Sequence, residues 1–219
     1  MYNRYECVRG KRLVLTPYLP LHVPTYHKWM TDAALLATTC SEPLTLDEEY
    51  ENQQSWLAST DKLTFILHVP MTVLSEMNVP SEGLTSLDLD GERLVMVGDC
   101  NVFVPLPHVV EDNGGVEVEV MLAETRFRRL GLAREAMQLL IVYATCRLGF
   151  RSFVAKILES NVDSRNLFVH GLGFRHFKNV PVFDEVHFVR YANDHDVETF
   201  AVTSGYSPSG LGELKLVLP

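Results

Sequence analysis

The feature that most constrains this fold is a strand, a tight basic loop and a helix in direct succession. Residues 116–123 begin with alternating valine and glutamate, the two-residue period of a half-buried strand. Residues 133–144 carry apolar side chains at helical spacing. Arg128, Arg129 and Gly131 lie between them. Because the first turn of a helix leaves N–H groups unpaired, the junction predicts a phosphate or pyrophosphate site. An ordinary strand-to-helix turn has the same pattern, so the loop alone leaves both interpretations open.

Composition narrows the class of protein. The chain has 219 residues, of which 47% are hydrophobic, enough for one large domain with a real core. Its net charge of −9 argues against non-specific nucleic-acid binding and disfavours an anionic membrane surface. The N-terminal residues form no apolar signal segment, and no apolar run is long enough to span a membrane. Four widely spaced cysteines indicate reduced thiols and no metal site. We therefore expect a cytoplasmic protein without a metal.

Hydrophobic periodicity predicts further elements on both sides of the central stretch. Thr45 and Glu48 have the capping-box spacing at the start of one of the helices. Gly98 interrupts one strand, which indicates a bulge or hairpin feature. The order predicts a mixed α/β sheet with helices on both faces. Strands are expected over 12–17, 62–69, 94–104, 152–158, 177–183 and 186–191, helices over 20–39, 45–58 and 161–170, and loops over 70–93, resembling an insertion, and 105–115.

Four segments carry a resemblance to a known family. They are the loop Arg128–Ala133, the strand Val116–Ala123, the segment Asn161–Phe174, and Ser41–Trp56 taken with Val97–Asn101. Together they resemble the GNAT family of acetyl-CoA-dependent N-acetyltransferases. The last pair resembles a eukaryotic branch related to the bacterial ribosomal-protein N-acetyltransferases.

The resemblance implies a domain over residues 10–191, with 192–219 as a C-terminal extension in which 214–218 could be a strand. Its fold would be a mostly antiparallel sheet that splays between the family's fourth and fifth strands. The implied reaction transfers an acetyl group from acetyl-CoA to an amine, either a protein α-amino group or a lysine side chain. It needs no metal and no covalent enzyme intermediate.

The resemblance also assigns the cofactor site. The loop backbone would hold the pyrophosphate, and the end of the preceding strand would pair with the pantetheine arm as an added strand does. Ala133 stands where many members have glycine, which the family pattern allows because a methyl group is small. Asn161 would hydrogen-bond the pantetheine amide. The implied cofactor-binding residues are Met121, Leu122, Ala123, Arg128, Arg129, Leu130, Gly131, Leu132, Ala133, Asn161, Ser164 and Phe168.

The reaction needs a neutral amine, and hence a base or a proton path. Glu117 and Glu119 are two residues apart on one strand and therefore point to one face. The resemblance favours Glu117 as the base, directly or through water, with Glu119 nearby. The alternative is that both simply form the solvated face of the strand.

Many relatives protonate the leaving thiolate with a tyrosine, but the matching residue here is Phe168. The segment from Ser164 to Gly173 is one residue longer than usual, which leaves the register open. His170 could serve as the acid, or it is a surface histidine.

Two further questions stay open in the sequence. Trp29, Tyr50 and Trp56 could line the acceptor cleft or could be core residues. The lack of a tyrosine at Phe168 motivates an alternative function, a CoA-binding interaction module without turnover. A nucleotide-binding protein with an ordinary phosphate loop is a third reading, which lacks the acidic ribose-binding residue at the expected distance.

Overall fold

The structure, a computed structural model, describes residues 6–89, 91–104 and 115–206. The strands are β1 (Val8–Arg9), β2 (Val14–Pro17), β3 (Lys62–Pro70), β4 (Ser86–Leu89), β5 (Glu92–Phe103), β6 (Val116–Leu122), β7 (Ser152–Leu158), β8 (Arg175–Val180) and β9 (Glu185–Tyr191). The helices are α1 (Val23–Trp29), α2 (Ala33–Thr39), α3 (Leu46–Ala58), α4 (Leu132–Leu148), α5 (Val162–Asn166) and α6 (Asp194–Ser204). Short 3-10 turns are η1 (Pro20–His22), η2 (Met71–Val73), η3 (Thr125–Phe127) and η5 (Pro181–Phe183), and η4 (Leu167–Gly171) is a π-helical turn.

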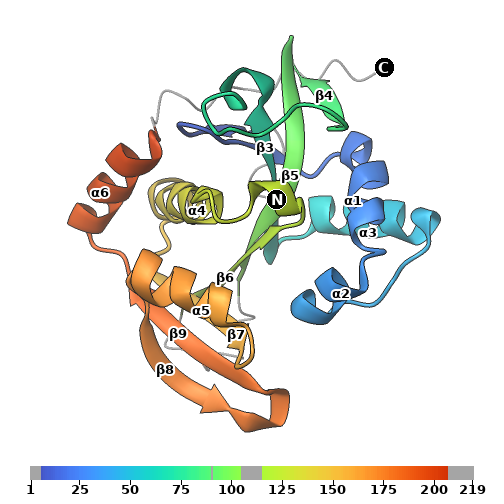
Figure 1. The fold of residues 1–219 in the computed structure, drawn as a ribbon. Coiled ribbons are helices and arrows are strands. Elements are labelled where there is room, and N and C mark those ends of the chain that lie inside the picture. The colour runs from blue at the N-terminus through green and yellow to red at the C-terminus, as the bar shows by residue number, and fades with distance from the viewer. Residues whose placement is uncertain (1–5, 90, 105–114, 207–219) are drawn as a thin grey trace.

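The described strands form one sheet that opens at its middle. Its order is β1-β2-β3-β5-β6-β7-β9-β8, with β4 paired to β5. All neighbours are antiparallel except β6 and β7, which are parallel. Those two strands pair only through Val116 with Phe153 and Glu117 with Val154, and they diverge beyond Glu117. The predicted mixed sheet, mostly antiparallel and splayed between these strands, is therefore confirmed (Figure 1).

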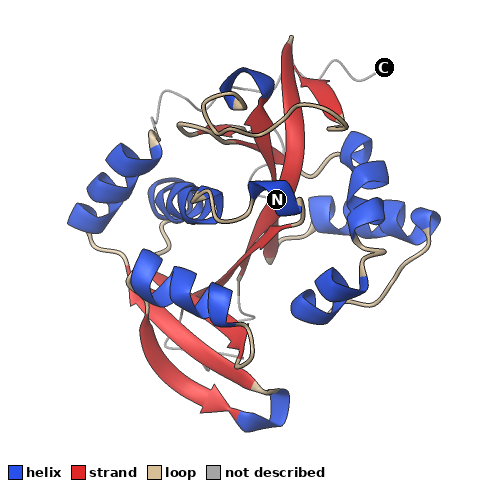
Figure 2. Ribbon diagram, viewed as in Figure 1, coloured by secondary structure: helices blue, strands red, loops and turns tan. Residues whose placement is uncertain are grey.

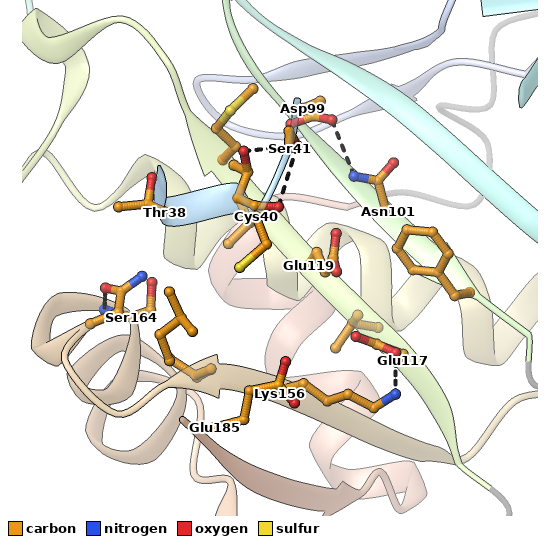
Figure 3. Close-up of a pocket in the computed structure, with 18 of the residues that line it drawn as sticks. Thr38, Cys40, Ser41, Asp99, Asn101, Glu117, Glu119, Lys156, Ser164 and Glu185 are labelled. Carbon is orange, nitrogen blue, oxygen red and sulfur yellow. Dashed lines mark hydrogen bonds and ion pairs between the residues drawn. The ribbon is translucent and has the colours of Figure 1, made fainter. Parts of the chain in front are cut away.

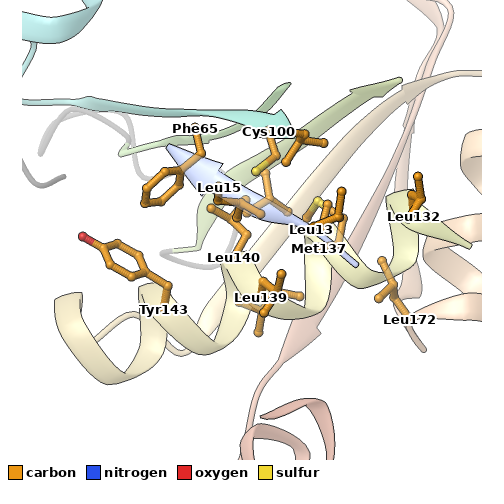
Figure 4. Packing of buried hydrophobic residues seen from close by; sticks show 14 of the residues in the cluster. Leu13, Leu15, Phe65, Cys100, Leu132, Met137, Leu139, Leu140, Tyr143 and Leu172 are labelled. Atoms are coloured by element: carbon orange, nitrogen blue, oxygen red, sulfur yellow. The ribbon is translucent and has the colours of Figure 1, made fainter. Parts of the chain in front are cut away.

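One face of the sheet is apolar and packs on α4. Phe65 of β3, Cys100 of β5 and Val118 of β6 belong to one buried cluster with α4 (Figure 4). The ring of Phe65 meets the ring of Tyr143 edge-on, with centroids 5.1 Å apart. Because strand side chains alternate between faces, the residues between these point to the opposite side.

The opposite face packs on the three N-terminal helices. Tyr26, Trp29 and Leu35 from α1 and α2 form a second buried cluster with Ile66 of β3 and Met96 of β5. Figure 1 shows α1, α2 and α3 on one side of the sheet and α4 and α6 on the other, and Figure 2 shows the strands between these two groups of helices. Helices thus cover both faces, as predicted.

Gly98 allows β5 and β6 to approach closely. The pairing of β5 with β3 changes register between Leu67 and His68, opposite this glycine. A Cβ added at Gly98 would lie 1.9 Å from the carbonyl oxygen of Met121 on β6. Any side chain here would push the two strands apart, so the predicted irregularity at Gly98 is confirmed and has a steric cause.

Two predicted elements are wrong in their bounds. Residues 20–39 are not one helix, because the chain turns after Trp29 and starts α2 at Ala33. The side chain of Asp32 accepts hydrogen bonds from the backbone N–H groups of Ala34 and Leu35, which makes Asp32 a helix N-cap. The strand expected over 177–183 instead covers 175–180, and η5 follows it. The capping box of Thr45 and Glu48 at the start of α3 is confirmed.

Two segments that were predicted as a loop (70–93) and as a C-terminal extension (192–219) contain regular secondary structure. Within 70–93, β4 pairs with β5, so this stretch is not a loop throughout. Within 192–219, α6 begins at a capping box formed by Asn193 and Asp196, and Phe200 belongs to the same buried cluster as α4. The predicted strand at 214–218 and nearly all of the loop at 105–115 lie outside the described residues.

Candidate active site

The loop before α4 has the backbone shape of an anion site. Gly131 is the N-cap of α4 with φ of +80°, and Arg129 has φ of +64°, both in the left-handed region. Such turns direct successive backbone N–H groups toward one side. Arg12 fixes the loop from behind, since its Nη1 donates to the carbonyl of Leu130 at 2.8 Å and its Nε to Glu135 at 2.9 Å. The first turn of α4 therefore offers its free N–H groups in a fixed geometry.

Both arginines of the loop bind protein groups. The Nε of Arg128 donates to the carbonyl of Leu122 at 2.9 Å. Arg129 forms an exposed ion pair with Asp163 at 2.5 Å. A hollow of about 520 Å³ runs beside them between β6 and α5. Of the sequence-predicted cofactor residues, those lining it are Met121, Leu122, Arg128, Arg129, Gly131, Leu132, Ala133, Asn161 and Ser164.

Along the edge of β6 that faces away from β5, only every second residue presents its backbone N–H and C=O groups. The carbonyl of Met121 faces Gly98 on β5, and the N–H of Ala123 donates to the carbonyl of Val97 at 3.0 Å. Since backbone groups alternate between the two edges of a strand, those of Val120 and Leu122 face the gap toward β7. Among the predicted strand residues, only Leu122 therefore presents its backbone to the gap. Val120 was missed, although the period of two could have indicated it.

The second predicted cofactor segment lies across the gap from β6. Asn161 is the N-cap of α5, where its Oδ1 accepts from the N–H of Ser164 at 3.1 Å. Both residues line the hollow beside the α4 loop and also the cavity on its other side. The structure thus brings together the two segments that the sequence placed at one cofactor.

A π-helical turn, η4, lies where the resemblance indicated one extra residue. A π-turn fits one more residue than an α-turn does. Within it, Phe168 is 3% exposed, packs edge-on against Phe174 and lines the cavity. His170 is exposed and does not line the cavity. Phe168, which the resemblance matched to the family tyrosine, therefore lines the cavity with a ring that has no proton to donate.

The cavity, of about 340 Å³, opens where β6 and β7 separate. Figure 3 shows Glu117 and Glu119 pointing into it from β6, as their spacing predicted. Glu117 forms an ion pair with Lys156 of β7 at 2.8 Å. Solvent reaches Glu119, yet the protein around it removes much of its hydration. This desolvation, together with the charges of Glu117 and Asp99, raises the pKa of Glu119 to about 7.

A hydrogen-bonded row stands beside Glu119. Asn101 pairs with Glu119 across β5 and β6, and its Oδ1 accepts from the hydroxyl of Thr64 at 2.6 Å. The Nδ2 of Asn101 donates to Asp99 at 3.1 Å, and the hydroxyl of Tyr26 donates to the same oxygen at 3.2 Å. Asp99 is 2% exposed, and burial raises its pKa. Asp99 and Asn101 belong to a segment that carries the family resemblance, whereas Thr64 and Tyr26 do not, and the sequence analysis gave none of the four a role.

Lys62, which the sequence analysis missed, lies on the same face. Its Nζ sits over the ring of Trp56 and 4.8 Å from the ring centre of Phe103. Burial lowers the pKa of Lys62 to about 8. Trp56 lines the cavity, whereas Trp29 donates its Nε1 to Glu124 at 2.9 Å within the core. Tyr50 packs against the same core, so only Trp56 of the three suggested aromatics faces the cavity.

Comparisons with known proteins fit this geometry. Residues 12–175 match the model of an acetyltransferase (GNAT) domain. The chain belongs to the GNAT acetyltransferase family. It is therefore an acetyl-CoA-dependent N-acetyltransferase, with acetyl-CoA as its cosubstrate.

Relatives of this acetyltransferase carry the name of one branch. It is 41% identical over 185 residues to an N-acetyltransferase 9-like protein of Caenorhabditis briggsae, covering 84% of this chain and 85% of that one. It is 38% identical over 185 residues to alpha/beta-tubulin-N-acetyltransferase 9 of Homo sapiens, covering 84% and 82%. This confirms the predicted eukaryotic branch.

A solved structure shares the fold. RimL, a ribosomal L7/L12 α-N-protein acetyltransferase in complex with coenzyme A, superposes with a TM-score of 0.61 at 15% identity, covering 83% of this chain and 95% of that one. No helix among residues 6–89, 91–104 and 115–206 has the length and apolar character needed to cross a membrane.

Proposed function

We propose that this enzyme acetylates the α-amino group of a protein N-terminus in the cytoplasm, with tubulin as the first acceptor to test. The human and other relatives are named for tubulin, and RimL for an α-amino group of a ribosomal protein. The cavity extends between β6 and α1–α3, and it meets solvent near Trp56, which leaves an entry for a flexible chain end.

The cofactor fits the hollow next to the cavity. Gly131 and Ala133 carry little or no side chain at the start of α4, so a pyrophosphate can approach the backbone there. The backbone of Val120 and the N–H of Leu122 offer the open strand edge to the pantetheine arm, whereas the carbonyl of Leu122 already accepts from Arg128, and Asn161 faces this edge from α5. Arg128 and Arg129 act mainly on the protein, holding Leu122 and α5.

Glu119, rather than Glu117, is the base in this proposal. One observation carries it: both glutamates of β6 line the cavity, and of these two only Glu117 is ion-paired with a lysine. No described residue forms an ion pair with Glu119, and its pKa of about 7 suits a group that must take up a proton near neutral pH. Glu119 takes a proton from the incoming ammonium, directly or through water.

No side chain is assigned to protonate the leaving thiolate. Phe168 cannot donate, and burial beside Asp99 raises the pKa of Tyr26 above its ordinary range, which makes that phenol a weak acid. Turnover then depends on holding amine and thioester together, with a backbone N–H polarising the thioester carbonyl.

The test compares three variants with N-terminal peptides of α- and β-tubulin as acceptors. Glu119→Gln should lower kcat by about 100-fold or more without changing CoA affinity. Glu117→Gln should cost less. Gly131→Val should weaken CoA binding, measured by calorimetry, in a protein that stays folded. CoA binding without turnover on any acceptor would instead favour an interaction module, and unchanged kcat in Glu119→Gln would remove Glu119 as the base.

A further inference from the structure

Lys62 has an unusual position for a lysine in an enzyme that acetylates amines. It is the first residue of β3, and its side chain lines both the cavity and an adjoining outer hollow formed with Ser59 and Asp61. Only one other lysine among the described residues lines the cavity, and that lysine, Lys156, is ion-paired with Glu117. No described carboxylate forms an ion pair with Lys62.

The surroundings of Lys62 shift its amine toward the neutral form, which is the form that can react with a thioester. The rings of Trp56 and Phe103 exclude water from its Nζ and attract the charged ammonium. With a pKa of about 8, roughly one such amine in four is neutral at pH 7.5, against about one in a thousand for an ordinary lysine. Loss of the proton also abolishes the attraction to the rings, so the neutral amine is the form that can leave them.

The sheet places Lys62 in the same row of residues as the start of the splay. Lys62 pairs with Phe103, and Phe103 pairs with Glu117, so the three residues form one row across β3, β5 and β6. Adjacent strands are about 4.8 Å apart, which separates the backbones of Lys62 and Glu117 by about 10 Å. An extended lysine side chain crosses more than half of that distance. The charge of Glu119 already acts on Lys62 across the cavity.

We propose that Lys62 is an autoacetylation site, modified by acetyl-CoA bound in the same molecule; this inference rests on the proposed function. The neutral Nζ attacks the carbonyl carbon of the thioester, and an N–C amide bond forms as the C–S bond breaks. The sulfur leaves as the CoA thiolate. The proton released from Nζ passes to Glu119, as it does from an acceptor amine.

Acetylation of Lys62 would change the cavity in two ways. It removes the positive charge that faces Asp99 and Glu119, so the pKa of Glu119 rises further and less of the base is ready at neutral pH. It also adds an acetyl group beside Trp56, on the acceptor side. The modified enzyme is therefore expected to turn over protein acceptors more slowly.

The experiment incubates the full chain with acetyl-CoA at pH 7.5, with and without an acceptor peptide, and follows each lysine by peptide mass spectrometry. Lys28, an exposed lysine on α1, reports the uncatalysed background in the same sample. Lys62 should be acetylated at least tenfold faster than Lys28, and more slowly when acceptor is present. Glu119→Gln should reduce the Lys62 rate to background while leaving Lys28 unchanged. Lys62→Arg should abolish the signal, whereas Lys28→Arg, on the exposed surface of α1, should retain it.

The outcomes separate this inference from the proposed function. Acceptor turnover with Lys62 no faster than Lys28 would overturn autoacetylation and leave the proposed function intact. Equal Lys62 rates in the unchanged enzyme and in Glu119→Gln would mean chemical acetylation, and would also overturn it. If neither the acceptor nor Lys62 is acetylated, both proposals fail together.

Discussion

The two faces of the sheet at β3, β5 and β6 differ sharply, although neighbouring residues of the same strands build both. The face toward α4 holds residues such as Phe65, Cys100 and Val118, packed into one dry cluster. The face toward α1–α3 holds Asp99 and Glu119, together with amides and lysines around a cavity. The contrast shows how a single strand can contribute to the core with every second residue and to the chemistry with the rest.

Because the two faces differ in this way, they are expected to contribute differently to stability and to catalysis. Side chains on the α4 face are fully enclosed, so their loss leaves a void that the structure cannot fill. Charges on the other face are incompletely hydrated, and their pKa values shift accordingly. Stability should therefore depend mainly on one face and turnover on the other.

The largest loss of stability is expected from a substitution on the face of the sheet that packs on α4. Phe65→Ala removes a ring with no exposed surface that meets Tyr143, and should lower the free energy of unfolding by about 3–5 kcal/mol. Denaturant unfolding followed by circular dichroism measures this, with Phe65→Leu as the milder control. The kcat per folded molecule should hardly change. A variant with normal stability but low kcat would contradict the separation of the faces.

The next largest effect is expected at His68, a polar side chain that is buried on the same face of the sheet as the cavity but does not line it. Burial lowers the pKa of His68 to about 4, against about 6.5 in an unfolded chain. Between these values the unfolded chain binds a proton that the folded one does not. The stability contribution is thus complete above pH 6.5 and lost as pH falls toward 4, amounting to about 3 kcal/mol.

His68→Leu provides the control for that measurement. The leucine has a similar volume and cannot be protonated, so unfolding midpoints of the variant should fall less steeply between pH 6.5 and 4 than those of the unchanged chain. Nearby His22 is also buried, and burial lowers its pKa, so some acid sensitivity should remain. Identical pH profiles in both proteins would show that His68 is hydrated in solution.

A smaller effect concerns the pH dependence of turnover. If Glu119 must be ionised, kcat/KM should fall about tenfold for each pH unit below its pKa of about 7. Glu117→Gln removes a neighbouring negative charge, which lowers the pKa of Glu119 and moves the acidic limb to lower pH. Stopped assays with a fixed acceptor peptide measure this. An acidic limb near pH 4.5 in the unchanged enzyme would mean that Glu119 behaves as an ordinary solvated carboxylate.

The smallest effect is expected at the exposed rim of the cofactor hollow. Arg129 and Asp163 form an ion pair whose side chains are 80% and 77% exposed. Arg129→Ala should change the free energy of unfolding by less than about 1 kcal/mol. It should also weaken CoA binding less than Gly131→Val does, by calorimetry. A larger loss than in Gly131→Val would show that the guanidinium, not the backbone, dominates binding of the anion.

Much of this arrangement could be predicted from the sequence because it is local. The alternation at 116–119 specified that Glu117 and Glu119 share a face, and Gly131 marked the start of α4. The family resemblance supplied the partner segment at Asn161. The ion pair on which we base the proposal of Glu119 as the base could not be predicted, because only the folded sheet brings Lys156 of β7 to Glu117.

Other features escaped for related reasons. Asp32 lies inside an apolar stretch with helical periodicity, but its side chain caps the start of α2 instead of continuing the preceding helix. The strand β4 is short and its residues are polar, so only its pairing with β5 defines it. Lys62 and Asp99 meet around the cavity from different strands, and no spacing in the sequence links them.

The π-helical turn at Leu167–Gly171 allows the wall of the cavity to be changed by altering the length of the chain rather than by substituting a side chain. Deleting one residue there would convert the π-helical turn into an ordinary α-helical turn and leave the segments on either side nearly in register. Which side chain of the turn packs against Phe174 and lines the cavity would then depend on which residue is removed. A single-codon deletion could thus change one wall of the cavity while every remaining amino acid stays the same.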